Sequence, residues 1–216
     1  ETLPNAFWEF SGVTCLNTIG GASYTNVSNA TNGVVVTLDP GADVTCTFLN
    51  NKLGPTRTLG FWQTHLTYTT SVFNAPANIF PWFSVGNMTV GSGIAGGSQD
   101  PIDSVPKLFG GFWSNIAKKT NKSNRSALDK ARMQLAQQLL AAQLNCAAFG
   151  CPASIQTMIA TANTNYAGLS ISAILASASA LDGYNNSGDT ITIGPAGKAD
   201  PKGVKAIAEY VFWDAP

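Results

Sequence analysis

Charged side chains are scarce in this chain of 216 residues, since Asp, Glu, Lys and Arg together make up 11% of it. A soluble domain usually carries about 25%. Acidic and basic residues balance at 12 each, so no net positive charge attracts a polyphosphate, and we expect no nucleic-acid partner. A surface solvated mainly by hydroxyls and amides favours an extracellular protein over a cytosolic enzyme.

Long apolar runs are missing as well. No stretch reaches the roughly 20 residues that cross a bilayer, so we do not expect a membrane-spanning protein. No basic and apolar leader follows Glu1, and we expect the chain to begin on a mature or trimmed protein. Hydrophobic residues still make up 44%, which is typical of a globular chain rather than a disordered one.

Histidine is limited to His65, which stands beside aromatic residues. A triad of His65 with Ser71 or Asp103 lacks a nucleophile elbow, so we interpret this histidine as structural. Asp100 and Asp103 could hold calcium together with loop carbonyls. Two carboxylates are too few to specify such a site, and turn capping is the favoured interpretation.

Asp182 and Asp189 could imitate the carboxylate pair of a glycosidase, but nothing in the sequence fixes their separation. Taken with the single histidine, this predicts no catalytic residue, no metal site and no cofactor. We therefore expect a protein that is not an enzyme.

Cysteine occurs four times, in two local pairs, which favours disulfides and an oxidising compartment over free buried thiols. The intervals fit no zinc ribbon. We predict that Cys15 pairs with Cys46, where two strands meet, and that Cys146 pairs with Cys151 beside a turn between helices. Extracellular glycans are also possible, because six Asn-x-Ser/Thr sequons occur, at Asn26, Asn29, Asn87, Asn121, Asn124 and Asn185.

Residues 1–53 have the pattern of strands, predicted at 7–15, 34–38 and 44–49, with a turn at 39–43. Alternation in the last strand places Val44, Cys46 and Phe48 on one inward face. We also expect Phe7, Phe10, Val13 and Val35 to point inward. So few strands leave one face and both edges of a sheet open, and the unit looks incomplete.

Residues 54–216 are expected to form a mainly helical, loop-rich domain. Little periodicity is present up to residue 112, and the Gly-rich stretch 91–98 is predicted to be loop rather than a phosphate-binding turn. Helices are predicted from Ser126 to Asn145, from Pro152, from Ser170 to about Gly183, and from Asp200 through Val211. Their inward stripes include Leu175 in the third helix and Ile207 in the fourth.

Two groups of side chains carry alternative interpretations. The basic run 118–125 is predicted to be a solvated approach to the first helix. Seven aromatic residues could form a sugar-stacking platform, although packing in the core is the favoured interpretation: Phe61, Trp62, Phe80, Trp82, Phe83, Phe112 and Trp113.

The β segment resembles a known family. Glu1-Thr2-Leu3-Pro4, Gly12-Val13-Thr14-Cys15 and the stretch 38–50 are similar to the closing half of the Cna-B or SpaA-type prealbumin-like module of secreted prokaryotic surface proteins and pilins. The resemblance implies paired, disulfide-bridged Val-Thr-Cys strands. It also places Glu1 and Asn50 at positions used for isopeptide formation, but the strand supplying the lysine is missing. We expect either a trimmed chain or strands provided by a neighbouring molecule.

A second resemblance begins at the stretch 59–65, Leu-Gly-Phe-Trp-Gln-Thr-His, and continues at 135–145 and 181–186. It is similar to an uncharacterised helical domain with a Gly-Tyr/Phe-Trp-Lys-x-His signature, which often follows such modules in exported proteins. Gln63 replaces the usual lysine. This resemblance implies where the protein is located and which modules accompany the domain, but it implies no activity.

The sequence thus predicts an α+β protein, with a small antiparallel, immunoglobulin- or prealbumin-like β module at 1–53 and a helical domain at 54–216. We expect an extracellular structural protein, a homo-oligomer or polymer that forms a surface filament by sharing strands between subunits. The donor would be a loop of the 75–100 region or the terminal segment 210–213 of a neighbour. The alternative is a secreted adhesin or carbohydrate-binding module.

Overall fold

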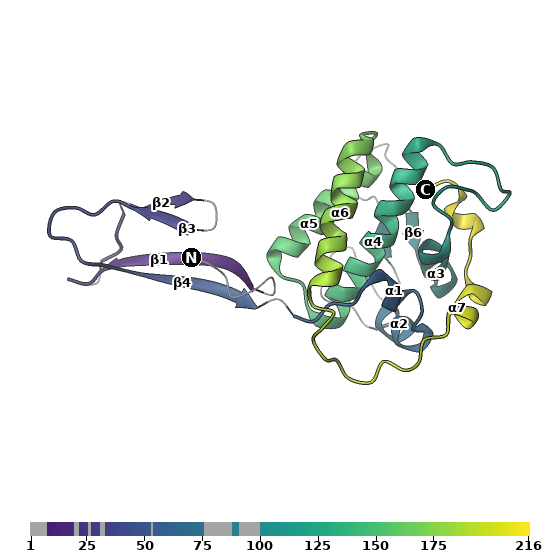
Figure 1. The fold of residues 1–216 in the computed structure, drawn as a ribbon, viewed down its shortest axis with the longest axis horizontal. Helices are drawn as coiled ribbons and strands as arrows, with labels where there is room; N and C mark the ends of the chain where they lie inside the picture. Colours follow the sequence, from purple (N-terminus) through teal and green to yellow (C-terminus); the bar gives the residue numbers. More distant parts are fainter. Residues whose placement is uncertain are drawn as a thin grey trace. The chain divides into compact units, whose positions relative to one another are not determined.

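The computed structural model describes residues 8–19, 22–25, 27–30, 33–52, 54–75, 88–90 and 100–216. The chain divides into two compact units, Glu1–Gly54 and Pro55–Pro216, and the division lies one residue beyond the boundary expected from the sequence. The first unit contains strands and the second is mainly helical, so the fold is α+β (Figure 1).

In the described residues of the β unit, the strands form two two-stranded antiparallel ladders. β1 (Trp8–Asn17) pairs with β4 (Val44–Lys52), and β2 (Val27–Ala30) pairs with β3 (Gly33–Val36). The sequence did not predict β2, because Val-Ser-Asn-Ala contains only one β-branched residue, Val27, and no aromatic residue to indicate a strand. An immunoglobulin-like sandwich is therefore not established by the described residues.

The β1–β4 ladder has the register that the cysteines predict. Cys15 lies opposite Cys46, and the two are joined by a disulfide. Val44, Cys46 and Phe48 are half-buried whereas Thr45 and Thr47 are exposed, as the alternation predicts.

The predicted turn before β4 is also present. Gly41 has a φ of 79°, and the Ala42 N–H donates to the Asp39 carbonyl at 2.9 Å. Tyr24 ties this turn to the rest of the unit, because its hydroxyl donates to the Thr37 carbonyl at 2.7 Å and accepts from the Asp39 N–H at 2.9 Å.

Burial in the β unit is slight. Of its described side chains, Cys15 alone is buried, at 6% exposure. Val35, predicted to point inward, is 55% exposed, because β3 pairs only with the short β2 among the described strands. Phe7 and Glu1 lie outside the described residues, and Asn50 lies in β4 opposite Phe10, so the isopeptide expectation stays a prediction.

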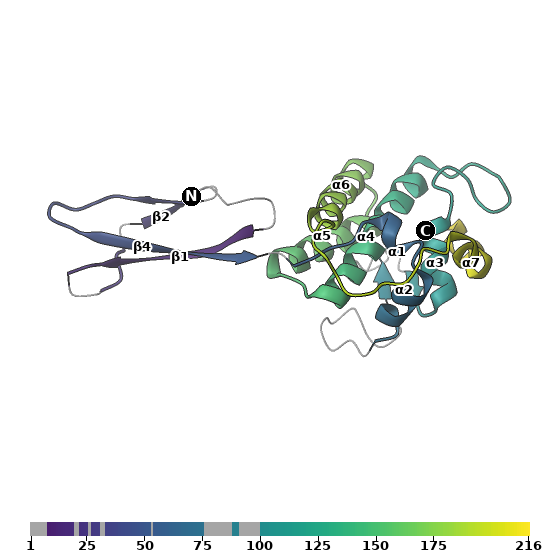
Figure 2. The same cartoon turned by 60° about the horizontal axis from the view of Figure 1, so that its bottom comes forward.

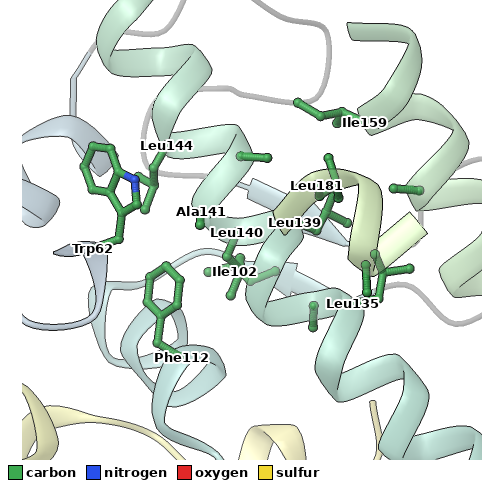
Figure 3. Close-up of a cluster of buried hydrophobic side chains, with 14 of the residues drawn as sticks. Trp62, Ile102, Phe112, Leu135, Leu139, Leu140, Ala141, Leu144, Ile159 and Leu181 are labelled. Atoms are coloured by element: carbon green, nitrogen blue, oxygen red, sulfur yellow. The ribbon is translucent and has the colours of Figure 1, made fainter. Parts of the chain in front are cut away.

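The helical unit is organised around one long helix, α4 (Ala127–Phe149). α5 (Ala153–Ala167) and α6 (Ile171–Ser187) pack along one flank of it, and the shorter elements lie on the other, as Figures 1 and 2 show. These shorter elements are α1 (Leu59–Trp62), α2 (Leu66–Phe73), β5 (Met88–Val90), β6 (Asp100–Ile102), α3 (Val105–Trp113), α7 (Pro201–Ile207) and the 3₁₀ helix η1 (Val211–Asp214). Figure 3 shows Leu135, Leu139 and Leu144 of α4 at the centre of the core.

Several helix ends differ from the predictions. α4 begins after Ser126, whose Oγ caps it by accepting from the Asp129 N–H, but it continues past Asn145 to Phe149. Cys146 therefore lies inside the last turns of α4, where it forms the predicted disulfide with Cys151. α6 continues through Gly183 to Ser187, because the buried side chains of its last turns hold it against α4.

The predicted stripes also need correction. Leu175 of α6 is 39% exposed, since the buried face of this helix is formed by Ile174, Ala178 and Leu181. α7 ends at Ile207, which is 41% exposed, and Val211 belongs to η1 instead.

Three helices lie in the segment before α4, where the sequence has little periodicity and predicts no helix. α1, α2 and α3 have at most nine residues each, too short for a helical period to stand out. Their caps are nevertheless ordinary, since Thr58 Oγ1 accepts from the Phe61 N–H and Ser104 Oγ from the Lys107 N–H.

The terminal segment packs on α3 of its own unit, which disfavours residues 210–213 as a donor strand for a neighbour. The alternative donor, a loop of the 75–100 region, falls mostly outside the described residues. Trp213 is fully buried, and its Nε1 donates to the Lys107 carbonyl at 2.8 Å. Gly110 makes the approach possible, because a Cβ atom at that position would stand 2.1 Å from the Glu209 carbonyl oxygen.

A buried amide, Asn145, joins three parts of the helical unit. Its Oδ1 accepts from the Arg57 main-chain N–H at 2.6 Å and from Trp62 Nε1 at 3.0 Å. Its Nδ2 donates to the Arg57 carbonyl and to Asn185 Oδ1, both at 2.9 Å. Asn145 thereby connects the segment before α1, α1 itself and α6 to α4.

We expect Asn145→Ala to lower the free energy of unfolding of the helical unit by about 3 kcal/mol or more, because several buried polar groups lose their partners at once. Asn186→Ala is the matched control, since Asn186 is exposed and bonds only locally to Asp182. Urea titration followed by tryptophan fluorescence measures both variants. Equal losses in the two would contradict the role given to Asn145.

Candidate functional site

A cavity of about 400 Å³ opens on the helical unit where α3, the loop that precedes α4 and the terminal segment meet. Its wall combines aromatic rings, hydroxyls, amides, three basic side chains and one carboxylate. The lining residues are Trp113, Ser114, Asn115, Lys118, Lys119, Thr120, Arg125, Tyr210 and Asp214.

The loop between α3 and α4 is held by its own polar side chains. Asn115 Oδ1 accepts from the Ala117 and Lys118 N–H groups, both at 2.8 Å. Lys118 forms an antiparallel bridge with Asn124, and Lys122 takes a positive φ of 67° at the tip. This arrangement brings Lys118 and Lys119 to the cavity and turns Arg125 inward.

Arg125 is 3% exposed, which corrects the prediction of a solvated basic run. Its Nε donates to the Asn115 carbonyl at 3.0 Å. Its Nη1 is buried and has no hydrogen-bond partner among the residues that the structure describes. Burial lowers the pKa of this guanidinium, and the Asp214 carboxylate acts in the opposite direction without forming an ion pair in the described structure.

Ser114 contributes a second buried donor. Its main-chain N–H closes α3 by donating to the Gly110 carbonyl at 2.8 Å. Its Oγ is buried and, within the described ranges, has no partner. Two hydrogen-bonding groups in one cavity wall are thus left unsatisfied, which is uncommon in folded proteins.

Asp214 faces these groups from η1. Its Oδ1 accepts from the Thr120 N–H at 2.8 Å, and its Oδ2 accepts from Thr120 Oγ1. Burial raises the pKa of Asp214, but the bonds from Thr120 and the charges of Arg125 and Lys119 outweigh it, and the net direction is down.

Two aromatic rings complete the wall. Trp113 is half-buried and its Nε1 donates to the Gln63 carbonyl at 2.8 Å, while Lys205 Nζ stands 4.0 Å from its ring centroid. Tyr210 donates from its hydroxyl to the Lys205 carbonyl at 3.2 Å. Burial raises the pKa of the Tyr210 hydroxyl, which therefore stays neutral.

The residues considered for chemistry lie elsewhere. His65 stacks on Phe61 at 4.0 Å between centroids, and its Nδ1 stands 2.9 Å from the Phe61 carbonyl oxygen. Ser71 Oγ donates to the Tyr68 carbonyl, so His65 and Ser71 have separate partners in the described structure. Asp103 pairs with Lys107 at 2.8 Å, a bond that lowers the pKa of Asp103.

The carboxylates considered as a glycosidase pair have separate partners. Asp182 accepts from Gln138 Nε2 at 2.9 Å, and Asp189 lies 3.9 Å from Arg57 Nη1. The side chain of Asp100 lies outside the described residues. In the described ranges no three His, Cys, Asp or Glu side chains are grouped so that they could hold a metal ion.

The seven aromatic residues do not form one platform. Trp62 and Phe112 are buried in the core, as the favoured interpretation predicted, and Phe61 packs against it. Among the described members of this group, Trp113 alone lines the cavity. Phe80, Trp82 and Phe83 lie outside the described residues.

The glycosylation candidates differ in accessibility. Asn121 and Asn124 are exposed in the loop beside the cavity. Asn185 is fully buried and its Nδ2 donates to the Gln138 side chain at 2.8 Å, so the folded unit has no room for a glycan there. Asn29 lies in β2, whereas Asn26 and Asn87 lie outside the described residues.

No protein-family model matches the chain, and comparisons with curated proteins and with solved structures gave no match. The resemblances to a prealbumin-like module and to a helical domain therefore stay hypotheses. No helix in the described ranges is long and apolar enough to cross a membrane.

Sequence reasoning missed the cavity because its residues come from three separate segments. One signal was available: Asn115, Asn121 and Ser123 are turn-forming residues among the lysines, and they indicate an ordered loop rather than a solvated approach. Nothing in the sequence indicated that Arg125 is buried.

The lowered pKa of Asp214 can be tested by measuring stability at acidic pH. A carboxyl whose pKa is lower in the folded chain than in the unfolded one stabilises the fold above the unfolded value, and this contribution is lost as the pH falls below about 3.9. We expect the Asp214→Asn variant to lose less stability than the parent protein over that interval. Urea unfolding at a series of acidic pH values measures it, and identical pH dependence in the two proteins would contradict the assignment.

Proposed function

We propose that the chain is an extracellular structural protein whose copies assemble by adding β-strands at the outer edge of β4. The observation that carries the proposal is that β4, nine residues long, pairs with no described strand other than β1. A two-stranded ladder is marginal by itself in water, and a further strand would stabilise it.

The hydrogen bonds of β1 indicate which groups of β4 face outward. The Cys15 carbonyl accepts from the Tyr24 N–H, and the Asn17 N–H donates to the Ala22 carbonyl, both at 2.9 Å. These two β1 residues direct main-chain groups away from β4. In an antiparallel ladder their opposite residues, Cys46 and Val44, then direct theirs away from β1.

Most of the edge lacks the protections that proteins commonly use. From Val44 to Asn51 the strand contains no charged residue and no proline, and its one lysine, Lys52, is the last residue. The single bulge of the ladder lies in β1, between Phe10 and Gly12. The other edge of the ladder is partly covered, since Ser23 bridges to Leu16. β4 is therefore the side on which a strand can be added.

A second copy of this chain suits the edge. Two β4 strands running antiparallel would place uncharged Thr45 and Thr47 side by side, with no like charges opposed. A pair of this kind is closed by its twofold symmetry, so growth into a filament needs a second contact. β3 and the turn after it, which expose Val35 and Leu38, are available for that contact.

Location outside the cell is supported by composition and by the disulfides. Two disulfides form within the described residues, and disulfides persist in oxidising compartments. The small share of charged residues fits a subunit whose surface is partly covered in an assembly.

The experiment places lysines on the edge. Thr45 and Thr47 are exposed, so a double substitution by lysine leaves a single copy intact and opposes charges in the pair. We expect the parent protein to associate with rising concentration and the double variant to dissociate at least about tenfold more readily. Light scattering after size exclusion measures the mass.

Thr14→Lys is the matched control. Thr14 is exposed and lies opposite Thr47 within the same ladder, so its lysine stands on the same face but one strand from the edge. Equal dissociation in both variants would indicate stacking of faces rather than edge pairing. A parent protein that stays a folded monomer at high concentration would refute the proposal.

A further inference from the structure

Arg125 differs from the other two arginines of the chain, although all three are buried. Arg57 donates from its two terminal nitrogens to carbonyls that include those of Thr56 and Ile191. Arg132 donates from Nη1 to the Pro216 carbonyl and from Nη2 to the Gly168 carbonyl. Arg125 alone leaves a buried terminal nitrogen without a partner in the described structure.

A buried guanidinium that leaves a terminal nitrogen without a partner is costly for a fold to keep. The cavity beside Arg125 offers space for a ligand that would pair with this nitrogen, and its wall indicates the kind of ligand. Ser114 Oγ is a second unsatisfied group in the same wall. Lys118 and Lys119 add positive charge, against the single carboxylate of Asp214, so the cavity favours a ligand with negative charge.

We propose that this cavity binds an acidic monosaccharide through its carboxylate. A guanidinium matches the planar carboxylate with two parallel donors. The remaining wall suits the sugar ring, since Trp113 and Tyr210 offer apolar surface and Asn115, Thr120 and Asp214 offer hydrogen bonds to hydroxyls. The Asp214 charge disfavours a doubly charged phosphate, and the volume of about 400 Å³ is that of a small-ligand site.

This inference is independent of assembly at β4, because every residue in it belongs to the helical unit. The test uses the full chain at a concentration where it is monomeric. Isothermal titration compares glucuronate with glucose, with inorganic phosphate and with a short peptide that offers only its C-terminal carboxylate. We expect glucuronate to bind at least about tenfold more tightly than any of the other three.

Arg125→Gln and Ser114→Ala test the two buried donors. We expect each to weaken glucuronate binding, the first at least about tenfold. In Ser114→Ala the unfolding temperature without ligand should be unchanged or higher, because an unsatisfied buried group is removed. A merely structural Ser114 would instead lower that temperature and leave binding unchanged. Ser114→Ala, which removes a single hydroxyl, keeps the test decisive if Arg125→Gln does not fold.

Lys202→Gln is the control, because Lys202 is an exposed lysine outside the cavity wall. It should leave binding unchanged. Glucuronate that binds no better than glucose would overturn the proposal, as would equal binding of phosphate or of the peptide carboxylate. Undiminished binding by both Arg125→Gln and Ser114→Ala would overturn it as well.

Discussion

The amide of Asn145 is the interaction on which the helical unit depends. It uses both its oxygen and its nitrogen inside the core, and through them it fixes the segment before α1, the indole of Trp62 and the amide of Asn185 to α4. Asn185 in turn donates to Gln138, which lies about two helical turns before Asn145 in α4. These neutral amides connect distant segments without the desolvation cost that buried ions carry. Arg57 and Arg132 make further long-range connections as buried cations, to carbonyls that include those of Ile191 and Pro216.

The β unit has no comparable centre. Its ladder is held by the Cys15–Cys46 disulfide, by the turn at Gly41 and by Tyr24, and its described side chains bury little besides Cys15. A disulfide restricts the unfolded chain but supplies no apolar surface. The two units therefore differ in what completes them: the helical unit is complete in its core, whereas the β unit gains most from a further strand. This difference is the physical basis of the proposed assembly.

Local sequence patterns correctly predicted the features that depend on local interactions. The alternation of Val44, Cys46 and Phe48, the turn at Gly41 and the caps at Ser126 and Ser170 are all present, because each depends on neighbouring residues. The sequence could not give the end of α6 or the packing of Trp213, since these depend on contacts with distant helices. It also could not give the cavity, whose unsatisfied donors exist only once three segments meet. Arg125 is buried although it follows several lysines in the sequence. Its burial depends on tertiary contacts, which composition does not indicate.

Amide hydrogen exchange at β4 tests edge pairing most directly. Main-chain groups of Val44 and Cys46 point away from β1, whereas those of Thr45 and Thr47 point toward it and serve as an internal reference. The account predicts that the Val44 and Cys46 amides become protected as the concentration of the chain rises, while the two threonine amides are protected throughout. Exchange at Val44 and Cys46 that is fast at every concentration, beside protected Thr45 and Thr47 amides, would contradict it.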